Sequence, residues 1–105
     1  MSARAITQRS AASYAVSGPL SLATVSALQR AGQRAFANAD PSFEVDLEGV
    51  AAVDSAGLAL LIDWLAWAAA HQRRLRYINV PAALQSLAGL SEVREWLKLP
   101  PATAS

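Results

Sequence analysis

The fold of this chain is decided by the segment Val53-Asp54-Ser55-Ala56-Gly57-Leu58. The residue pattern predicts that a β-strand is followed here directly by a helix. Asp54 and Ser55 are of the residue types that cap helix N-termini, because their side-chain oxygens accept hydrogen bonds from free backbone N–H groups. An acid there also meets the positive end of the helix dipole, and Gly57 lets a neighbouring backbone or a partner come close. We therefore predict a strand-to-helix turn at the carboxyl edge of a sheet, where α/β folds usually place ligands.

Two interpretations of this turn stay open on the residues alone. In the first, Asp54 and Ser55 are plain helix caps. In the second, Ser55 is a contact or modification site, since a phosphate on it would be favoured by the same dipole. Catalysis is not predicted, because the sequence has no Gly-x-Ser-x-Gly element and no glycine-rich phosphate loop. His71, the single histidine, follows Ser55 on the same predicted helix at a separation of about 24 Å.

Length and composition narrow the class of protein. A chain of 105 residues predicts one domain over 1–105, with a core of about 4–97 and a frayed tail at 98–105. Hydrophobic residues make up 53% and charged residues 16%, which excludes a disordered chain. A net charge of +1 with scattered basic residues argues against nucleic-acid binding. The absence of cysteine removes disulfides and thiolate zinc sites, and we expect no metal, no cofactor and a cytoplasmic location.

Outward from the turn, hydrophobic periodicity and turn residues predict the remaining elements. Gly18-Pro19 is expected to end the second strand, and Ser21 to cap a helix whose inner stripe includes Leu22. Strands separated by helices of this length must be parallel, so only the opening pair can be antiparallel. The sequence thus predicts an α/β domain with a small mixed sheet in the order β-β-α-β-α-β-α-α. Its strands are expected at 4–8, 13–17, 43–47 and 75–80, and its helices at 22–37, 55–72, 81–90 and 92–97.

The predicted helix 55–72 is unusually apolar, with Asp63 the exception between residues 56 and 70. Fifteen helical residues span about 22 Å, short of a hydrocarbon core of about 30 Å, so we expect no membrane insertion. At about 100° per residue, one arc should face the sheet. It consists of Leu58, Leu61, Ile62, Leu65, Ala68 and Ala69.

The opposite arc of this helix is also apolar, whereas a surface helix should be polar there. It comprises Ala56, Leu60, Asp63, Trp64, Trp67 and His71. Tryptophan is enriched at binding hot spots, so we predict a docking surface for another protein. The alternative is that the last helix or the C-terminal tail covers this arc. Asp63 would pair with a basic partner residue or be solvated, and His71 is expected to be a solvated helix-end residue.

The segments Val45-Asp46-Leu47-Glu48-Gly49-Val50 and Val53-Asp54-Ser55-Ala56-Gly57-Leu58 resemble those of the STAS domains (sulphate transporter and anti-sigma factor antagonist). The likeness runs from about Tyr14 to Leu97. It implies a sheet of about four strands with helices mainly on one side, and a role in docking to a partner protein. In the anti-sigma factor antagonist branch, the serine matching Ser55 is phosphorylated by a partner serine kinase.

The other branch is the STAS subunit of the maintenance-of-lipid-asymmetry (Mla) phospholipid ABC transporter, which binds the cytoplasmic ATPase subunit. The apolar stretch 57–65 resembles this branch more closely, and Gly18-Pro19-Leu20-Ser21 lacks the acid that antagonists usually carry there. The resemblance implies a non-catalytic accessory subunit, peripheral to the inner membrane through its ATPase partner, with antagonist function as the alternative. An unpartnered helix face could also let the isolated chain form a homodimer. The expected contact residues are Asp54, Ser55, Ala56, Gly57, Leu60, Asp63, Trp64 and Trp67, with Ser55 a possible phosphorylation site.

Overall fold

The computed structural model describes residues 5–82 and 84. Within them the element order is β-β-α-β-α-β, as the sequence predicts. The predicted helices at 81–90 and 92–97 lie almost wholly outside the described residues, as does the tail. The elements are β1 (Ile6–Ser10), β2 (Ser13–Leu20), α1 (Val25–Phe36), β3 (Ser42–Val53), α2 (Ser55–Ala70) and β4 (Arg74–Ile78).

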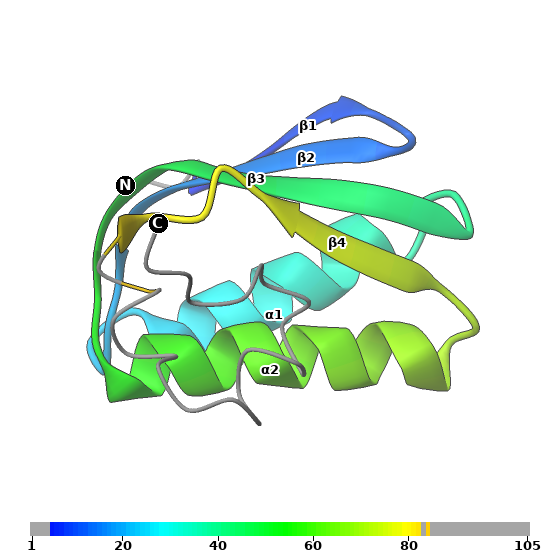
Figure 1. The fold of residues 1–105 in the computed structure, drawn as a ribbon. Helices are drawn as coiled ribbons and strands as arrows, with labels where there is room; N and C mark the ends of the chain where they lie inside the picture. Colours follow the sequence, from blue (N-terminus) through cyan, green and yellow to red (C-terminus); the bar gives the residue numbers. More distant parts are fainter. Residues whose placement is uncertain (1–4, 83, 85–105) are drawn as a thin grey trace, which may run out of the picture.

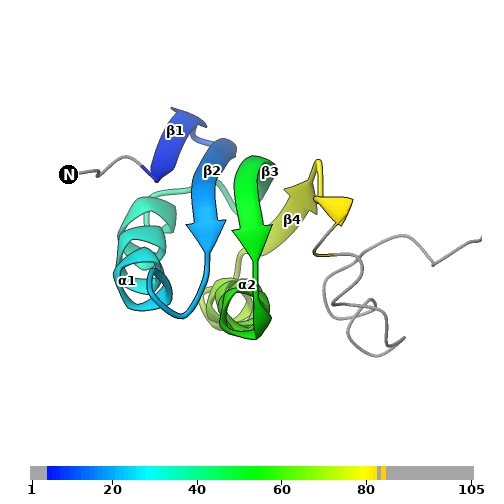
Figure 2. The same cartoon turned by 90° about the vertical axis from the view of Figure 1, so that its left-hand side faces the viewer.

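The four strands form one sheet in the order β1-β2-β3-β4. β1 pairs with β2 antiparallel, whereas β2–β3 and β3–β4 are parallel pairs. Figure 2 shows the sheet end-on, with α1 and α2 both packed beneath the same face. The predicted α/β class and the mixed, mostly parallel sheet are therefore confirmed, as is the placement of these two helices on one side.

Strand alternation divides the sheet into two faces. The face toward the helices carries the core, in which Tyr14, Val16, Val45 and Leu47 are fully buried or nearly so. Aromatic rings cluster at one end of this core, where Tyr14 meets Phe36 and Phe43 edge to face at centroid distances of 5.2 and 5.6 Å. The core thus lies between one sheet face and the two helices.

The other face of the sheet holds a buried charge, Asp46, which is 4% exposed. Its carboxylate accepts hydrogen bonds from Arg9 Nη1 at 2.8 Å, the Glu48 N–H at 2.8 Å and Asn79 Nδ2 at 3.1 Å. Burial alone raises the pKa of Asp46, but these three donors outweigh it and hold that pKa below its usual value. The carboxylate therefore ties β1, β3 and the residue after β4 together.

β2 and β3 run further than the sequence predicts. Gly18-Pro19 does not end β2, because Gly18 and Leu20 continue the parallel pairing opposite Val50 and Val53. A register shift between Gly18 and Leu20 accommodates Pro19, which has no N–H to donate, and Gly18 takes a φ of +87°. Both strands bend toward the helix layer and end beside the start of α2 (Figure 1). This brings Leu20 next to Asp54, whose N–H donates to the Leu20 carbonyl at 3.1 Å.

A large tryptophan side chain lies between the two helices. Trp64 of α2 is fully buried, and a Cβ built on Gly32 of α1 would lie only 2.5 Å from its indole ring. The ring of Phe36, one helical turn further along α1, contacts Trp64 edge to face at 5.3 Å. Gly32 is therefore the residue that lets the large ring lie against α1.

The predicted orientation of α2 is wrong by about a quarter of a turn. The sequence pattern places Leu60 and Trp64 on an exposed arc, yet they are 4% and 0% exposed. The physical reason is that α1 covers that arc, while the prediction considered only the sheet and the C-terminal segment. Ala69, expected to face the sheet, is exposed instead. The exposed line of α2 runs along Ser55, Ala59 and Ala66, with half-buried Ile62 between them.

We predict that Gly32→Ala lowers the free energy of unfolding by about 1–3 kcal/mol, because the added methyl overpacks against Trp64. Helix propensity alone would give the opposite sign, since alanine favours a helix over glycine by about 1 kcal/mol. Urea denaturation measures the difference. The same substitution in a Trp64→Phe background is the control, where the smaller ring should remove most of the penalty. A stabilised Gly32→Ala single variant would contradict the packing described here.

Candidate partner-docking site

Asp54 is the N-cap of α2, as one of the sequence alternatives predicts. Its Oδ1 accepts a hydrogen bond from the Gly57 N–H at 2.9 Å, and its Oδ2 accepts one from the Leu22 N–H at 3.1 Å. The bond from Gly57 is the main reason that the pKa of Asp54 lies below its ordinary value, followed by the bond from Leu22. One ionised carboxylate thus holds both the first turn of α2 and the loop between β2 and α1.

The residues that follow Asp54 differ in accessibility. Ser55 is exposed as the first residue of α2, and Ala56 is half-buried. Gly57 is buried, and a Cβ built on it would overlap the Leu20 carbonyl oxygen. The expected close approach at Gly57 is therefore made by the chain's own backbone. This residue is not an accessible contact, whereas Ser55 is.

The loop before α1 departs from the prediction. Thr24 rather than Ser21 is the N-cap residue of α1, and its side chain makes no capping bond to the helix. Thr24 Oγ1 instead donates to the Pro19 carbonyl at 3.0 Å and accepts from the Ser21 N–H at 3.0 Å. Because the helix starts later than expected, Leu22 lies in the loop and is 78% exposed rather than on the inner stripe. The sequence signal for this was Thr24, a second residue of the capping type three residues after Ser21.

One side of α2 is turned toward the solvent, and we call it the α2 outer face. It consists of Ser55, Ala59, Ile62 and Ala66. Their spacings of four, three and four residues place them on one line along the helix. Ala59 and Ala66 are exposed and Ile62 is half-buried. Apart from Ser55 this face is apolar, which is atypical of a surface helix, and Ile62 also packs against the edge of the core.

The remaining predicted contact residues occupy other positions. Half-buried Asp63 accepts a hydrogen bond from Gln29 Nε2 of α1 at 2.8 Å, so it pairs within the chain. Trp67 is half-buried near Phe36, and His71 stacks on it with ring centroids 4.2 Å apart. His71 is exposed at the C-terminal end of α2, as expected. The structure therefore brings Asp54, Ser55 and Ala56 together at one end of α2 and leaves Trp67 at the other.

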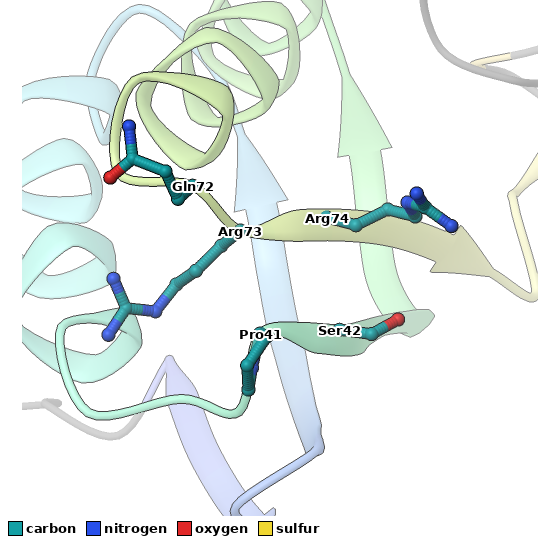
Figure 3. Close-up of a pocket in the computed structure, with 5 residues that line it drawn as sticks. All are labelled: Pro41, Ser42, Gln72, Arg73 and Arg74. Atoms are coloured by element: carbon teal, nitrogen blue, oxygen red, sulfur yellow. The ribbon is translucent and has the colours of Figure 1, made fainter.

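A hollow of about 360 Å³ lies at the opposite end of the sheet, lined by Pro41, Ser42, Gln72, Arg73 and Arg74. Figure 3 shows the two arginine side chains pointing away from each other. The Arg73 guanidinium donates to the carbonyls of Ala37 at 2.7 Å and Ala39 at 3.1 Å, just after α1. Arg73 therefore stabilises the fold by holding the segment after α1. The polar side chains around the hollow do not point toward one common point, as they would in a ligand site.

Residues 5–82 and 84 contain no group of three or more histidine, cysteine or acidic side chains placed to hold a metal ion. None of the helices in that part of the chain has both the length and the apolar character needed to cross a bilayer.

We predict that Gly57→Ala destabilises the protein by about 1–3 kcal/mol, because the new methyl overlaps the Leu20 carbonyl and pushes the turn open. Thermal unfolding followed by circular dichroism measures the loss. Ala59→Gly serves as a comparison, since it changes only helix propensity on the exposed side, at about 1 kcal/mol. A Gly57→Ala protein as stable as the wild type would show that Leu20 and α2 are not in contact.

No curated protein matches this chain by sequence. Among solved structures, the anti-sigma factor antagonist SpoIIAA in its unphosphorylated form aligns with a TM-score of 0.68 at 18% identity, covering 94% of this chain and 87% of that one. SpoIIAA of Bacillus in the phosphorylated form gives 0.65 at 18%, covering 94% and 90%. An anti-sigma factor antagonist from Mycobacterium paratuberculosis gives 0.65 at 20%, covering 94% and 84%. At these identities the likeness shows the fold alone.

The sequence match is to a family model. The model described as "Mlab, STAS domain" matches residues 5–100. This chain therefore belongs to the STAS domain family, whose members are generally non-catalytic regulatory or accessory proteins.

Proposed function

We propose that this chain is a non-catalytic accessory subunit that binds the ATPase subunit of a bacterial phospholipid ABC transporter, one that maintains outer-membrane lipid asymmetry. The observation that carries the proposal is the match of residues 5–100 to the family model described as "Mlab, STAS domain". The subunit would lie in the cytoplasm, peripheral to the inner membrane through its partner. Its contribution would be to stabilise the ATPase, with no bond made or broken on the chain itself.

The α2 outer face supports this role by its chemistry. Ala59 and Ala66 are small, so a partner's helix could approach the α2 backbone closely, and Ile62 between them offers apolar area. Replacing water by a partner's apolar side chains on such a surface is favourable. The docking surface that we propose is therefore this face, in place of the buried arc that contains Leu60 and Trp64.

The negative charge beside the α2 outer face favours a partner surface that carries basic residues. The two carboxylates at this site, Asp54 and Asp63, flank the α2 outer face, and α2 itself carries no basic residue. Both carboxylates already accept hydrogen bonds from the chain, but each keeps lone pairs for a further donor. An ATPase surface that combines apolar side chains with lysine or arginine would complement this side of the domain.

The proposal predicts that Ala59→Arg and Ala66→Arg each abolish co-purification with the ATPase subunit, because a long charged side chain would keep the surfaces apart. Both positions are exposed, so the folded domain should retain its circular dichroism spectrum and unfolding midpoint. Co-expression of the chain with the ATPase subunit, followed by affinity purification, measures the complex.

Ala27→Arg is the matched control, since Ala27 is an exposed alanine on α1. It should leave the complex intact. Full co-purification of the Ala59→Arg and Ala66→Arg proteins would remove α2 from the interface. Failure of the wild-type chain to bind any phospholipid-transporter ATPase from its own organism would remove the proposed function.

The second candidate, an anti-sigma factor antagonist, is favoured by the exposure of Ser55 at the N-terminus of α2. A phosphate there would meet free N–H groups and the positive end of the helix dipole. It would also stand beside the ionised Asp54, whose like charge opposes it.

This candidate predicts that an anti-sigma factor serine kinase phosphorylates Ser55, adding a phosphate detectable by mass spectrometry of the intact chain. Ser55→Ala should abolish the modification and Ser55→Asp should weaken kinase binding. Ser26→Ala, a change at an exposed serine of α1, should leave the modification unaffected. A wild-type chain that stays unmodified with every such kinase of its organism would exclude the antagonist role.

A further inference from the structure

We infer that Leu22 is the apolar anchor with which this chain engages the ATPase subunit, and that Asp54 positions it; the inference rests on the proposed function. Leu22 was expected inside the core and lies outside it, with 78% of its surface exposed. Among the described residues it is the one large hydrophobic side chain that is exposed. Single exposed leucines are ordinary on protein surfaces, so the inference depends on how this one is held.

The loop that carries Leu22 is held by hydrogen bonds at the Leu22 N–H and at the residues on either side of it, Ser21 and Thr24. The Leu22 N–H donates to Asp54 Oδ2 at 3.1 Å, and Asp54 lies 32 residues further along the chain. Thr24 Oγ1 accepts from the Ser21 N–H and donates to the Pro19 carbonyl, each at 3.0 Å. The Ser21 carbonyl also accepts from the N–H groups of Thr24 and Val25. A side chain presented on a backbone ordered in this way loses less entropy on binding than one on a mobile loop.

Asp54 connects this loop to the α2 outer face. Its Oδ1 holds the first turn of α2 through Gly57, while its Oδ2 holds Leu22. Ser55, the first residue of the α2 outer face, follows Asp54 directly. Leu22 therefore lies beside the N-terminal end of this face, at the edge of the sheet where β2 and β3 both end. The loop and the helix thus form one continuous surface, with an exposed leucine at its end and small residues along its length.

The occupant we assign is an apolar pocket of the ATPase subunit with a basic rim. The pocket follows from the leucine, since binding hot spots are side chains that fill desolvated pockets. The basic rim follows from Asp54 and Asp63, the two carboxylates of this surface, and from the absence of any basic residue on α2. Asp54 is a positioning residue in this arrangement, and Leu22 is the contact.

Isothermal titration calorimetry of the full chain against the purified ATPase subunit of the same organism's phospholipid transporter tests the anchor. Leu22→Ala should weaken binding about tenfold or more, and Leu22→Asp should abolish it. Both variants should unfold at the wild-type temperature, because the side chain is outside the core. Ala27→Asp, at an exposed position of α1, should bind as the wild type does.

Asp54→Asn tests the positioning role separately. Leu22 and Gly57 donate to different oxygens of the Asp54 carboxylate, and asparagine replaces one of these two oxygens with an NH2 group, which is a donor. Asparagine remains a good helix cap through Gly57, so the bond from Leu22 is the one expected to be lost. Binding should weaken several-fold, and hydrogen exchange at the Leu22 amide should become faster. Unchanged exchange at Leu22 with unchanged affinity would overturn the positioning role of Asp54.

The anchor and the proposed function fail in distinguishable ways. If Leu22→Asp binds as tightly as the wild type while Ala59→Arg does not bind, the anchor is overturned and the ATPase role stands. If the wild-type chain itself does not bind the ATPase subunit, the proposed function is overturned and the anchor with it.

Discussion

The packing of Trp64 against Gly32 is the contact on which the arrangement of this domain depends. A buried tryptophan removes roughly 150–250 Å² of surface from water, worth about 4–6 kcal/mol at ~25 cal/mol per Å². Its indole N–H finds no acceptor among the described residues, at a cost of about 1–3 kcal/mol. Burial therefore outweighs the missing hydrogen bond. The ring fixes how close α1 and α2 lie and which side of α2 is turned away from the core.

That rotation determines what the domain can offer a partner. With the bulky side of α2 turned toward α1, the helix presents Ala59 and Ala66 to the solvent, with half-buried Ile62 between them. At the N-terminal end of α2, the capping carboxylate of Asp54 lies next to the loop that carries Leu22, and it accepts a hydrogen bond from that loop. Of the two tryptophans predicted to contact a partner, Trp64 is buried in the core, whereas Trp67 is half-buried, near Phe36 and stacked with His71.

The fold could be predicted from the sequence because the third strand alternates clearly and the connections through α1 and α2 are long enough to join parallel strands. The Asp54 cap could also be predicted, since capping depends on local residues only. The environment of Trp64 could not, because periodicity gives the spacing of apolar residues along α2 but not which neighbour lies on each side. Gly32 was the missing signal: a glycine inside a helix costs about 1 kcal/mol, and a close contact usually accounts for it. Leu22 was misplaced for a local reason, the choice between Ser21 and Thr24 as the start of α1.

The close approach of Leu20 to Gly57 has a consequence for how related sequences should be read. Any homologue that keeps this backbone must keep a glycine at this place, because every other residue would intrude on the Leu20 carbonyl. Selection on folding alone would therefore maintain the aspartate and the glycine of the Asp-Ser-x-Gly signature, whereas the exposed serine has no such role in the fold. Sequence divergence that tracks the choice of partner should instead be sought at residues such as Leu22, Ala59 and Ala66, which the fold leaves free to vary.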